Sequence, residues 1–297
     1  MDTDTGPADY MLFIEGKACG IIEAKREGSD LGGVAEQSGR YAMSTVKFIE
    51  RWAANDQPLP FLYEATNHEV RFRDERDPHP RSRNLFHFHK PETLKEWLEE
   101  AINVGWADAG SPTKFATLRG RLQNLPELNT EKLRACQIAA IHGIEASLKA
   151  GKPRALLQMA TGSGKTYTAV TQIYRLAKFA KIKRALFLVD RGNLGTNAKD
   201  EFEQFVIPHD GRKFTQHYNV NLLGRAGIPD ATKVTISTIQ RMYSQLTGQE
   251  LDDEADEHSG FEIEANTINK EPRPVSYNSN IPIEEFDVII IDECHRS

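Results

Sequence analysis

Ala155-Leu-Leu-Gln-Met-Ala-Thr-Gly-Ser-Gly-Lys-Thr-Tyr-Thr-Ala-Val170 is the stretch of the sequence that decides the fold. Its apolar start, Ala155 to Met159, predicts a buried parallel strand, and the apolar spacing from Ala169 to Ala177 predicts a helix. Glycines in the turn between them would let backbone N–H groups close around phosphate oxygens, and the helix N-terminus adds its positive end. The stretch therefore predicts a phosphate-binding loop. The alternative is a glycine turn that merely starts a helix.

The loop residues have separate expected roles. Lys165 is placed to reach the β- and γ-phosphates of a nucleotide, and the Thr166 hydroxyl is placed to hold Mg²⁺. Met159 stands where the strict pattern has glycine, so the loop resembles the Ala-Thr-Gly-Ser-Gly-Lys-Thr form of superfamily 2 helicases and translocases. We expect nucleotide contacts from Thr161, Gly162, Ser163, Gly164, Lys165 and Thr166.

A second buried strand is predicted at Val288 to Ile291. It runs into Asp292-Glu-Cys-His295, which resembles the DEAD/DExH box of the same superfamily. An aspartate at a strand tip can hold the Mg²⁺ of a nucleotide, and a glutamate beside it can orient or deprotonate the attacking water. We therefore expect Asp292 to bind metal and nucleotide, and Glu293 to be catalytic.

Segments around these motifs predict the rest of an α/β domain. Lys132 to Leu148 reads as a helix, and Gln137 near its start resembles the Q-motif glutamine of superfamily 2, which reads the adenine edge; the resemblance implies ATP. Arg184 to Asp190 and Lys233 to Gln240 read as strands, so strands and helices alternate as in a parallel, RecA-like sheet. Arg191 follows a strand tip and is a candidate DNA-phosphate contact.

A second constellation lies near the N-terminus. Gly6 to Lys25 reads as two strands joined at Gly16-Lys17, with Asp9 at the start and Glu23 and Lys25 on one face at the end. Asp9 and Glu23 would bind Mg²⁺ with the Ala24 carbonyl, and Lys25 would position the attacking water in phosphodiester hydrolysis. The pattern resembles that of PD-(D/E)xK nucleases. The alternative is a solvated hairpin edge, on which Glu23 and Lys25 form a weak surface pair.

The next segment, Val34 to Ala54, has helical apolar spacing. Gln37 and Tyr41 are four residues apart, so they share one face of the predicted helix. This Gln-x-x-x-Tyr resembles the extra motif of the RecB-like nuclease branch, where the pair helps to orient the site or the DNA. The alternative for Tyr41 is a plain core aromatic.

The remaining segments outline the domain organisation. We expect a nuclease domain over residues 1–110, a linker over 111–130 and a motor domain over 131–297, with a polar and acidic insertion at about 248–283. Residues 91–102 have the apolar stripe of a helix. Residues 71–83 are dense in charge and proline and read as an exposed loop; contact of their arginines with phosphates is the alternative.

Composition sets limits on the class of protein. The chain has 297 residues, 39% hydrophobic and 27% charged, which is ordinary for a globular protein. Its net charge of −6 argues against a wholly basic surface but leaves room for a basic groove. Cys19, Cys136 and Cys294 are scattered, as expected of reduced thiols in a cytoplasmic protein. No apolar run approaches the roughly 20 residues that span a bilayer, and no signal peptide is visible, so we expect no membrane association.

A nuclease pattern ahead of motor motifs resembles the R (restriction and translocation) subunit of type I restriction enzymes, over nearly the whole length. The most specific match is Asn280 to Ser297. The resemblance implies a PD-(D/E)xK domain followed by a RecA-like domain, an endonuclease that translocates double-stranded DNA with ATP and Mg²⁺, and a complex with methylation (M) and specificity (S) subunits.

Both ends of the sequence depart from that family pattern. Only eight residues precede Asp9, and the sequence stops two residues after His295. We therefore expect a fragment, with a truncated nuclease domain and an incomplete motor domain, that does not translocate DNA alone. Two other functions stay open at this point: another nuclease–helicase fusion in defence or repair, and an inactive remnant that only binds DNA or partner subunits.

Overall fold

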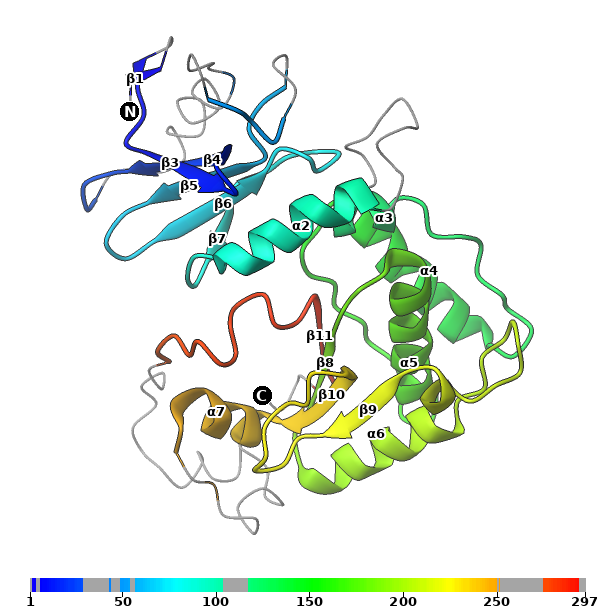
Figure 1. The fold of residues 1–297 in the computed structure, drawn as a ribbon. Helices are drawn as coiled ribbons and strands as arrows, with labels where there is room; N and C mark the ends of the chain where they lie inside the picture. Colours follow the sequence, from blue (N-terminus) through cyan, green and yellow to red (C-terminus); the bar gives the residue numbers. More distant parts are fainter. Residues whose placement is uncertain are drawn as a thin grey trace. The chain divides into compact units, whose positions relative to one another are not determined.

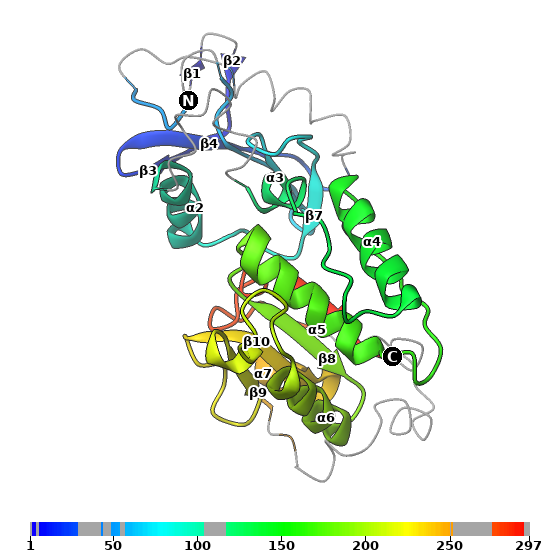
Figure 2. The ribbon, with the colours of Figure 1, turned by 90° about the vertical axis from the view of Figure 1, so that its right-hand side faces the viewer.

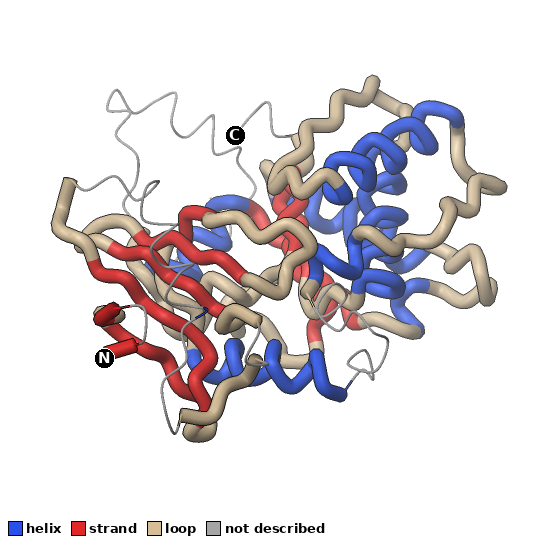
Figure 3. Tube along the Cα trace, turned by 90° about the horizontal axis from the view of Figure 1, so that it is seen from above, coloured by secondary structure: helices blue, strands red, loops and turns tan. Residues whose placement is uncertain are grey.

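Two units make up the chain, Met1–Arg121 and Leu122–Ser297, each with its own sheet (Figure 1). The computed structural model describes residues 2–3, 6–28, 43, 49–53, 57–103, 117–249, 251 and 275–293. Strands dominate the first unit, whereas helices surround the strands of the second (Figure 3). The architecture is therefore α/β, as the sequence predicts.

The first unit is organised around a five-stranded mixed sheet. In spatial order its strands are β3 (Tyr10–Ile14), β4 (Lys17–Ala24), β5 (Phe61–Ala65), β6 (Val70–Asp74) and β7 (Arg83–Leu85). Strands β4 and β5 pair in parallel, and the other neighbours pair antiparallel. The short strands β1 (Asp2–Thr3) and β2 (Gly6–Pro7) pair with each other in a separate ribbon.

The predicted N-terminal hairpin is confirmed as β3 and β4. Its turn lies at Glu15 and Gly16, one residue earlier than expected, with φ angles of 50° and 78°. Two successive left-handed residues match the right-handed twist of the flanking strands, which is why short hairpins favour such turns. The turn sets the pairing of Ile14 with Lys17, and a one-residue shift in register between Leu12 and Phe13 follows before the strands bring Asp9 close to the end of β4.

Both faces of this sheet carry apolar clusters. On one face, Phe61 and Tyr63 pack with Leu94 and Leu98 of α2 (Pro91–Asn103), the helix predicted from the apolar stripe. On the opposite face, Ile21 of β4 and Leu62 of β5 belong to a second cluster. The second face matters for function, because side chains two residues further along these strands point the same way.

Gly20 is the point of closest approach between β4 and β5. A Cβ atom built there would lie 2.3 Å from the Phe61 carbonyl oxygen, which is a backbone atom that cannot move aside cheaply. We expect Gly20→Ala to destabilise the chain by about 1–3 kcal/mol or more through overpacking. Urea denaturation followed by tryptophan fluorescence would measure this. Gly143→Ala is the matched control, because the space around Gly143 is open.

The prediction of an exposed loop at residues 71–83 is wrong. Val70–Asp74 forms β6, and Arg76 is 9% exposed. Its guanidinium donates to both carboxylate oxygens of Asp74, at 2.9 and 2.7 Å, and to the Trp97 carbonyl, while lying over the Phe61 ring. A fully paired guanidinium can be buried where an unpaired one cannot. The many charged residues of this segment therefore did not mean that their side chains are exposed to solvent.

The second unit is built on a four-stranded parallel sheet. In spatial order its strands are β11 (Val288–Ile291), β8 (Ala185–Val189), β10 (Thr232–Thr238) and β9 (Asn219–Leu222). The strands predicted at 184–190, 233–240 and 288–291 are confirmed. A parallel sheet needs cover on both faces, because its crossover segments lie on the faces.

Helices provide that cover. On one face α6 (Gly192–Gln204) packs on β8, β9 and β10, with Phe202 edge-on to Phe187. On the other face α7 (Ile239–Thr247) packs on β10, and Met242 joins an apolar cluster with Leu186. Helix α5 (Lys165–Arg175) contacts both α4 (Ala135–Lys149) and α6 (Figure 2). The short helical turns at Leu176–Ala180, Phe214–Gln216 and Leu118–Leu122 complete the described helices of the chain.

The prediction of a buried strand at Ala155 to Met159 is wrong. The segment has no strand assignment, and Leu156 is 83% exposed. Burial was also wrongly predicted for β11, because Ile289 is 56% and Ile291 45% exposed. Within the described residues, β11 lies at the edge of the sheet and pairs on one side, with β8. An apolar run becomes a buried strand only when a neighbouring strand is there to pair with it.

Among the residues described, none of the helices combines the length and apolar character required to span a bilayer.

Candidate functional site

The structure brings the nuclease-like residues together at the end of β4. The Asp9 carboxylate accepts a hydrogen bond from the Ala24 amide at 2.9 Å. Glu23 and Lys25 point to the same face, and the Lys25 ammonium lies 3.1 Å from the Glu23 carboxylate. The Lys25 amide donates to the Ala65 carbonyl at 2.8 Å, which fixes the strand end against β5. Because backbone pairing sets these positions, the cluster is part of the sheet and not of a loose hairpin edge.

Glu23 is the buried member of this cluster, at 1% exposed. Burial raises the pKa of its carboxyl group, Lys25 lowers that pKa, and the Asp9 carboxylate raises it. Its Oε1 atom is buried and has no hydrogen-bond partner within the described part of the chain. A buried carboxylate oxygen without a donor, beside a second carboxylate, fits a hard divalent cation that prefers oxygen ligands.

Proton competition should be visible at this cluster. Because the pKa of Glu23 is raised, protons should displace a divalent cation at a higher pH than an ordinary glutamate would allow. Without metal, the raised pKa affects stability in the opposite sense: the stability that the protonated carboxyl contributes is present at acid pH and is lost as pH rises through the raised pKa. Calorimetric titration of Mn²⁺ over a pH series would measure the effect. In Glu23→Gln the steep pH dependence should disappear, and its persistence there would contradict the assignment.

Two predicted nuclease residues, Gln37 and Tyr41, and most of the helix predicted over Val34 to Ala54 lie outside the described residues. Within the part of the chain that is described, no group of three or more His, Cys, Asp or Glu side chains is close enough to hold a metal ion. A cation at Asp9 and Glu23 would therefore need the Ala24 carbonyl and water as further ligands.

The predicted phosphate-binding loop lies between residue 160 and the start of α5. Gly162 and Gly164 have φ angles of 75° and 83°, the left-handed region that glycine occupies without strain. The Arg134 guanidinium donates to the Gly162 carbonyl at 2.8 Å. Ser163 donates to the Ala160 carbonyl at 2.6 Å and is partly exposed, as is Thr166 in the first turn of α5. Thr161 is exposed at the mouth of the loop. The turn therefore has the glycine conformations and the helix N-terminus that a phosphate group requires.

Gln137 joins this loop to α4. Its side-chain oxygen accepts from the Arg134 amide at 2.9 Å, and its side-chain nitrogen donates to the Gly164 carbonyl at 3.3 Å. A Cβ atom at position 164 would lie 2.4 Å from that nitrogen, so a larger residue there would displace the end of the Gln137 side chain. In this structure the Gln137 amide, 4% exposed, holds the loop in place. The contacts of Arg134 and Gln137 with the loop were not predicted, because they depend on packing between distant segments.

Lys165 reaches the end of β11. Its ammonium lies 2.6 Å from the Glu293 carboxylate, so the two motifs furthest apart in this unit meet at one point. Burial raises the pKa of the neighbouring Asp292. Glu293 has a φ angle of 54°, unusual for a residue with a side chain, and its amide donates to Asp292. The ammonium, the two carboxylates and the glycine turn together suit binding of a nucleotide triphosphate with its metal.

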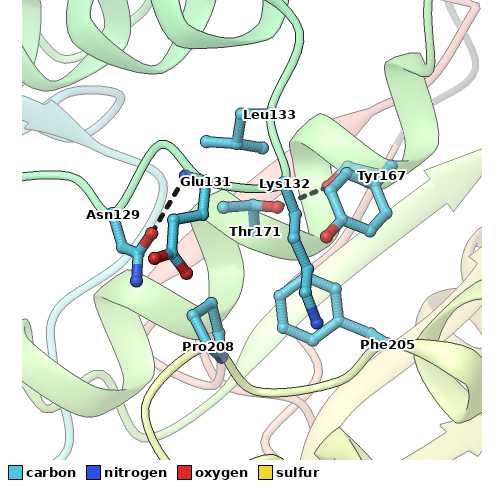
Figure 4. A pocket seen from close by; sticks show the side chains of 8 residues that line it. All are labelled: Asn129, Glu131, Lys132, Leu133, Tyr167, Thr171, Phe205 and Pro208. Atoms are coloured by element: carbon cyan, nitrogen blue, oxygen red, sulfur yellow. Dashed lines mark hydrogen bonds between the residues drawn. The ribbon is translucent and has the colours of Figure 1, made fainter.

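A small cavity lies beside helix α5 (Figure 4). It has a volume of about 30 Å³ and is lined by residues that include Leu133, Tyr167, Thr171 and Phe205. That is room for about two water molecules.

Arg191, the candidate DNA contact, follows Asp190 after the end of β8 and directly precedes α6. Its Nε atom is 3.4 Å from the carboxylate of Asp190, which is buried. The side chain of Arg191 is about a third exposed, so its guanidinium is partly accessible at the carboxyl edge of the sheet.

Comparison with known proteins covers both units. Residues 130–297 match the family model "Type III restriction enzyme, res subunit", and residues 1–69 match "Type I restriction enzyme EcoKI endonuclease subunit second domain". The chain is 27% identical to the EcoKI endonuclease subunit of Escherichia coli K12, over 98% of the chain and 24% of that protein. It is 27% identical to the EcoAI endonuclease subunit of E. coli, over 97% of the chain and 29% of that protein.

A relative from another genus agrees. The SauCOLORF180P endonuclease subunit of Staphylococcus aureus strain COL is 22% identical over 100% of the chain and 28% of its own length. These matches are all to restriction-enzyme subunits. The chain belongs to the family of type I restriction enzyme R subunits, which are hydrolases, and carries a res-subunit domain at residues 130–297. It spans about a quarter of the length of these relatives.

Proposed function

We propose that the chain carries the nuclease site and the ATP-binding lobe of a type I restriction endonuclease. In this proposal residues 1–110 form a PD-(D/E)xK, RecB-like nuclease domain, 111–130 a linker, and 131–297 a RecA-like motor domain. The substrate is double-stranded DNA, and M and S subunits supply site recognition. Family membership supports the class of enzyme, and the residues below support the chemistry.

The observation that carries the nuclease proposal is the meeting of Asp9, Glu23 and Lys25 at one strand end. Asp9, Glu23 and the Ala24 carbonyl would hold Mg²⁺, which when bound supplies a Lewis acid for the scissile phosphate. Lys25 is held by Glu23 beside the same place. Its ammonium would orient the attacking water and stabilise the negative charge that develops on the phosphate.

The second unit is proposed to bind ATP. Lys165 would contact the β- and γ-phosphates, Thr166 and Asp292 would hold Mg²⁺, and Glu293 would orient the attacking water. Because Lys165 is paired with Glu293, an incoming triphosphate must compete for the ammonium. Opening that pair would free both side chains for their roles. The glycine turn held by Gln137 is the feature that supports this part of the proposal.

Cleavage of supercoiled plasmid in Mg²⁺, with M and S subunits present, tests the nuclease proposal. Asp9→Asn removes one cation-binding carboxylate at nearly constant shape, and we expect cleavage to fall by about 100-fold or more. Asp230→Asn is the control, because the Asp230 side chain is fully exposed in the second unit. Equal cleavage by the Asp9 variant and the control would sink the proposal.

A further inference from the structure

A buried glutamate lies one strand away from the proposed nuclease site. In the parallel pairing of β4 with β5, Glu23 stands directly opposite Glu64. Ile21 and Leu62, two residues earlier on the same strands, belong to one apolar cluster, so both glutamate side chains lie on that face of the sheet. Glu64 is thus the partner of Glu23 on β5, although 41 positions separate them in the sequence.

Glu64 is fully buried, at 0% exposed. Ser82 donates a hydrogen bond to its Oε2 atom at 3.1 Å. The next strand places Arg71 opposite Glu64, and the Arg71 Nε atom has no hydrogen-bond partner within the described residues. One face of the sheet therefore carries the polar row Glu23, Glu64 and Arg71, with Asp9 and Lys25 beside its first member.

Two buried carboxylates on neighbouring strands repel each other unless a cation lies close by. Neighbouring strands are about 4.8 Å apart, a distance at which the charge of Glu64 acts strongly on a cation at Glu23. Glu64 does not join Asp9 and Glu23 in a three-carboxylate group, since the described residues contain no such group. It therefore lies outside the set of direct ligands.

We propose that Glu64 is a positioning residue of the nuclease site, whose buried negative charge raises the affinity of Asp9 and Glu23 for a divalent cation. The inference rests on the proposed nuclease function. Glutamine keeps an acceptor oxygen for the Ser82 hydrogen bond while removing the negative charge of Glu64. Glu64→Gln therefore separates the two roles.

Calorimetric titration of Mn²⁺ into the purified chain is the test, because it does not depend on DNA cleavage. Wild type should bind one Mn²⁺ that Asp9→Asn abolishes. Glu64→Gln should weaken that binding by about tenfold or more, as the loss of an outer-shell partner does elsewhere. Asp77→Asn is the control. This variant removes another buried carboxylate of the same unit. Asp77 comes just after Asp74, which pairs with Phe61 at the start of β5, whereas Glu64 lies near the end of that strand.

Arg71→Gln gives a second test with the opposite sign, since removing a positive charge from the row should tighten Mn²⁺ binding by a few-fold. The partly exposed Arg71 side chain should tolerate this change, so the test survives if Glu64→Gln fails to fold. The inference is overturned if both variants fold and bind Mn²⁺ with wild-type affinity. If Glu64→Gln does not fold, wild-type Mn²⁺ affinity of Arg71→Gln alone overturns it. Absence of an Asp9-dependent site in wild type would overturn the proposed nuclease function itself.

Discussion

Replacing Lys25 with alanine should reduce DNA cleavage by about 10²- to 10³-fold and leave Mn²⁺ binding intact or tighter. The ammonium stabilises charge that develops only in the transition state, and loss of one such donor typically costs that much. Its removal also frees the Glu23 carboxylate, 3.1 Å away, from a competing cation. Plasmid cleavage and calorimetric titration of the same preparation would measure the two effects.

Lys17→Ala is the matched control for Lys25→Ala. Lys17 begins the same strand, makes an exposed pair with Glu50 at 3.7 Å, and lies 5.6 Å from the centre of the Trp52 ring. That variant should cleave DNA at the wild-type rate, because exposed pairs contribute little. If Lys25→Ala cleaved like Lys17→Ala, the ammonium would have no part in the chemistry. If it lost cation binding as well, its role would be to hold the site together.

Replacing Lys165 with alanine should weaken ATP binding by roughly 10- to 100-fold, since hydrogen bonds to charged groups contribute about 1.5–3 kcal/mol. Lys165 starts α5 and reaches Glu293, so the variant removes a contact that joins the glycine turn to the end of β11. Fluorescence titration with a labelled ATP analogue in Mg²⁺ would measure the change. Mn²⁺ binding at Asp9 should be unaffected.

Glu293→Gln gives a reciprocal expectation. Because the Glu293 carboxylate competes with phosphate for Lys165, its neutralisation should tighten ATP binding while abolishing hydrolysis. Lys199→Ala is the control for both variants, because Lys199 lies on α6 in an exposed pair with Glu203. Unchanged nucleotide affinity in Lys165→Ala would rule out the proposed phosphate site.

The local sequence pattern correctly predicted those helices and strands that are encoded within their own residues. The stripe of α2, the buried β8 and the hairpin of β3 and β4 are each encoded by periodicity or turn chemistry. Segment 155–159 was mispredicted because an apolar run indicates a preference for burial. It does not show that another strand is present to pair with it. Segment 71–83 was mispredicted because the pairing of Arg76 with Asp74 is invisible until the chain folds.

The residues of the candidate site likewise divide into those that the sequence could indicate and those that depend on tertiary packing. Asp9, Glu23 and Lys25 could be proposed from sequence, because one hairpin carries all of them. The approach of Lys165 to Glu293 was implied only by motif resemblance, since 128 positions separate them. Glu64 could not be found at all, because parallel strands are joined by long connections and their register is set by tertiary packing.

The outer edge of β11, which has no paired strand among the residues that the structure describes, has a consequence for handling the protein in solution. Backbone donors and acceptors along that edge, beside exposed Ile289 and Ile291, form a template on which another extended chain can add as a strand. Leu156 and Leu157 add further exposed apolar surface to the same unit. Purified samples should therefore self-associate as concentration rises, and a lysine at position 289 or 291 should keep them monodisperse.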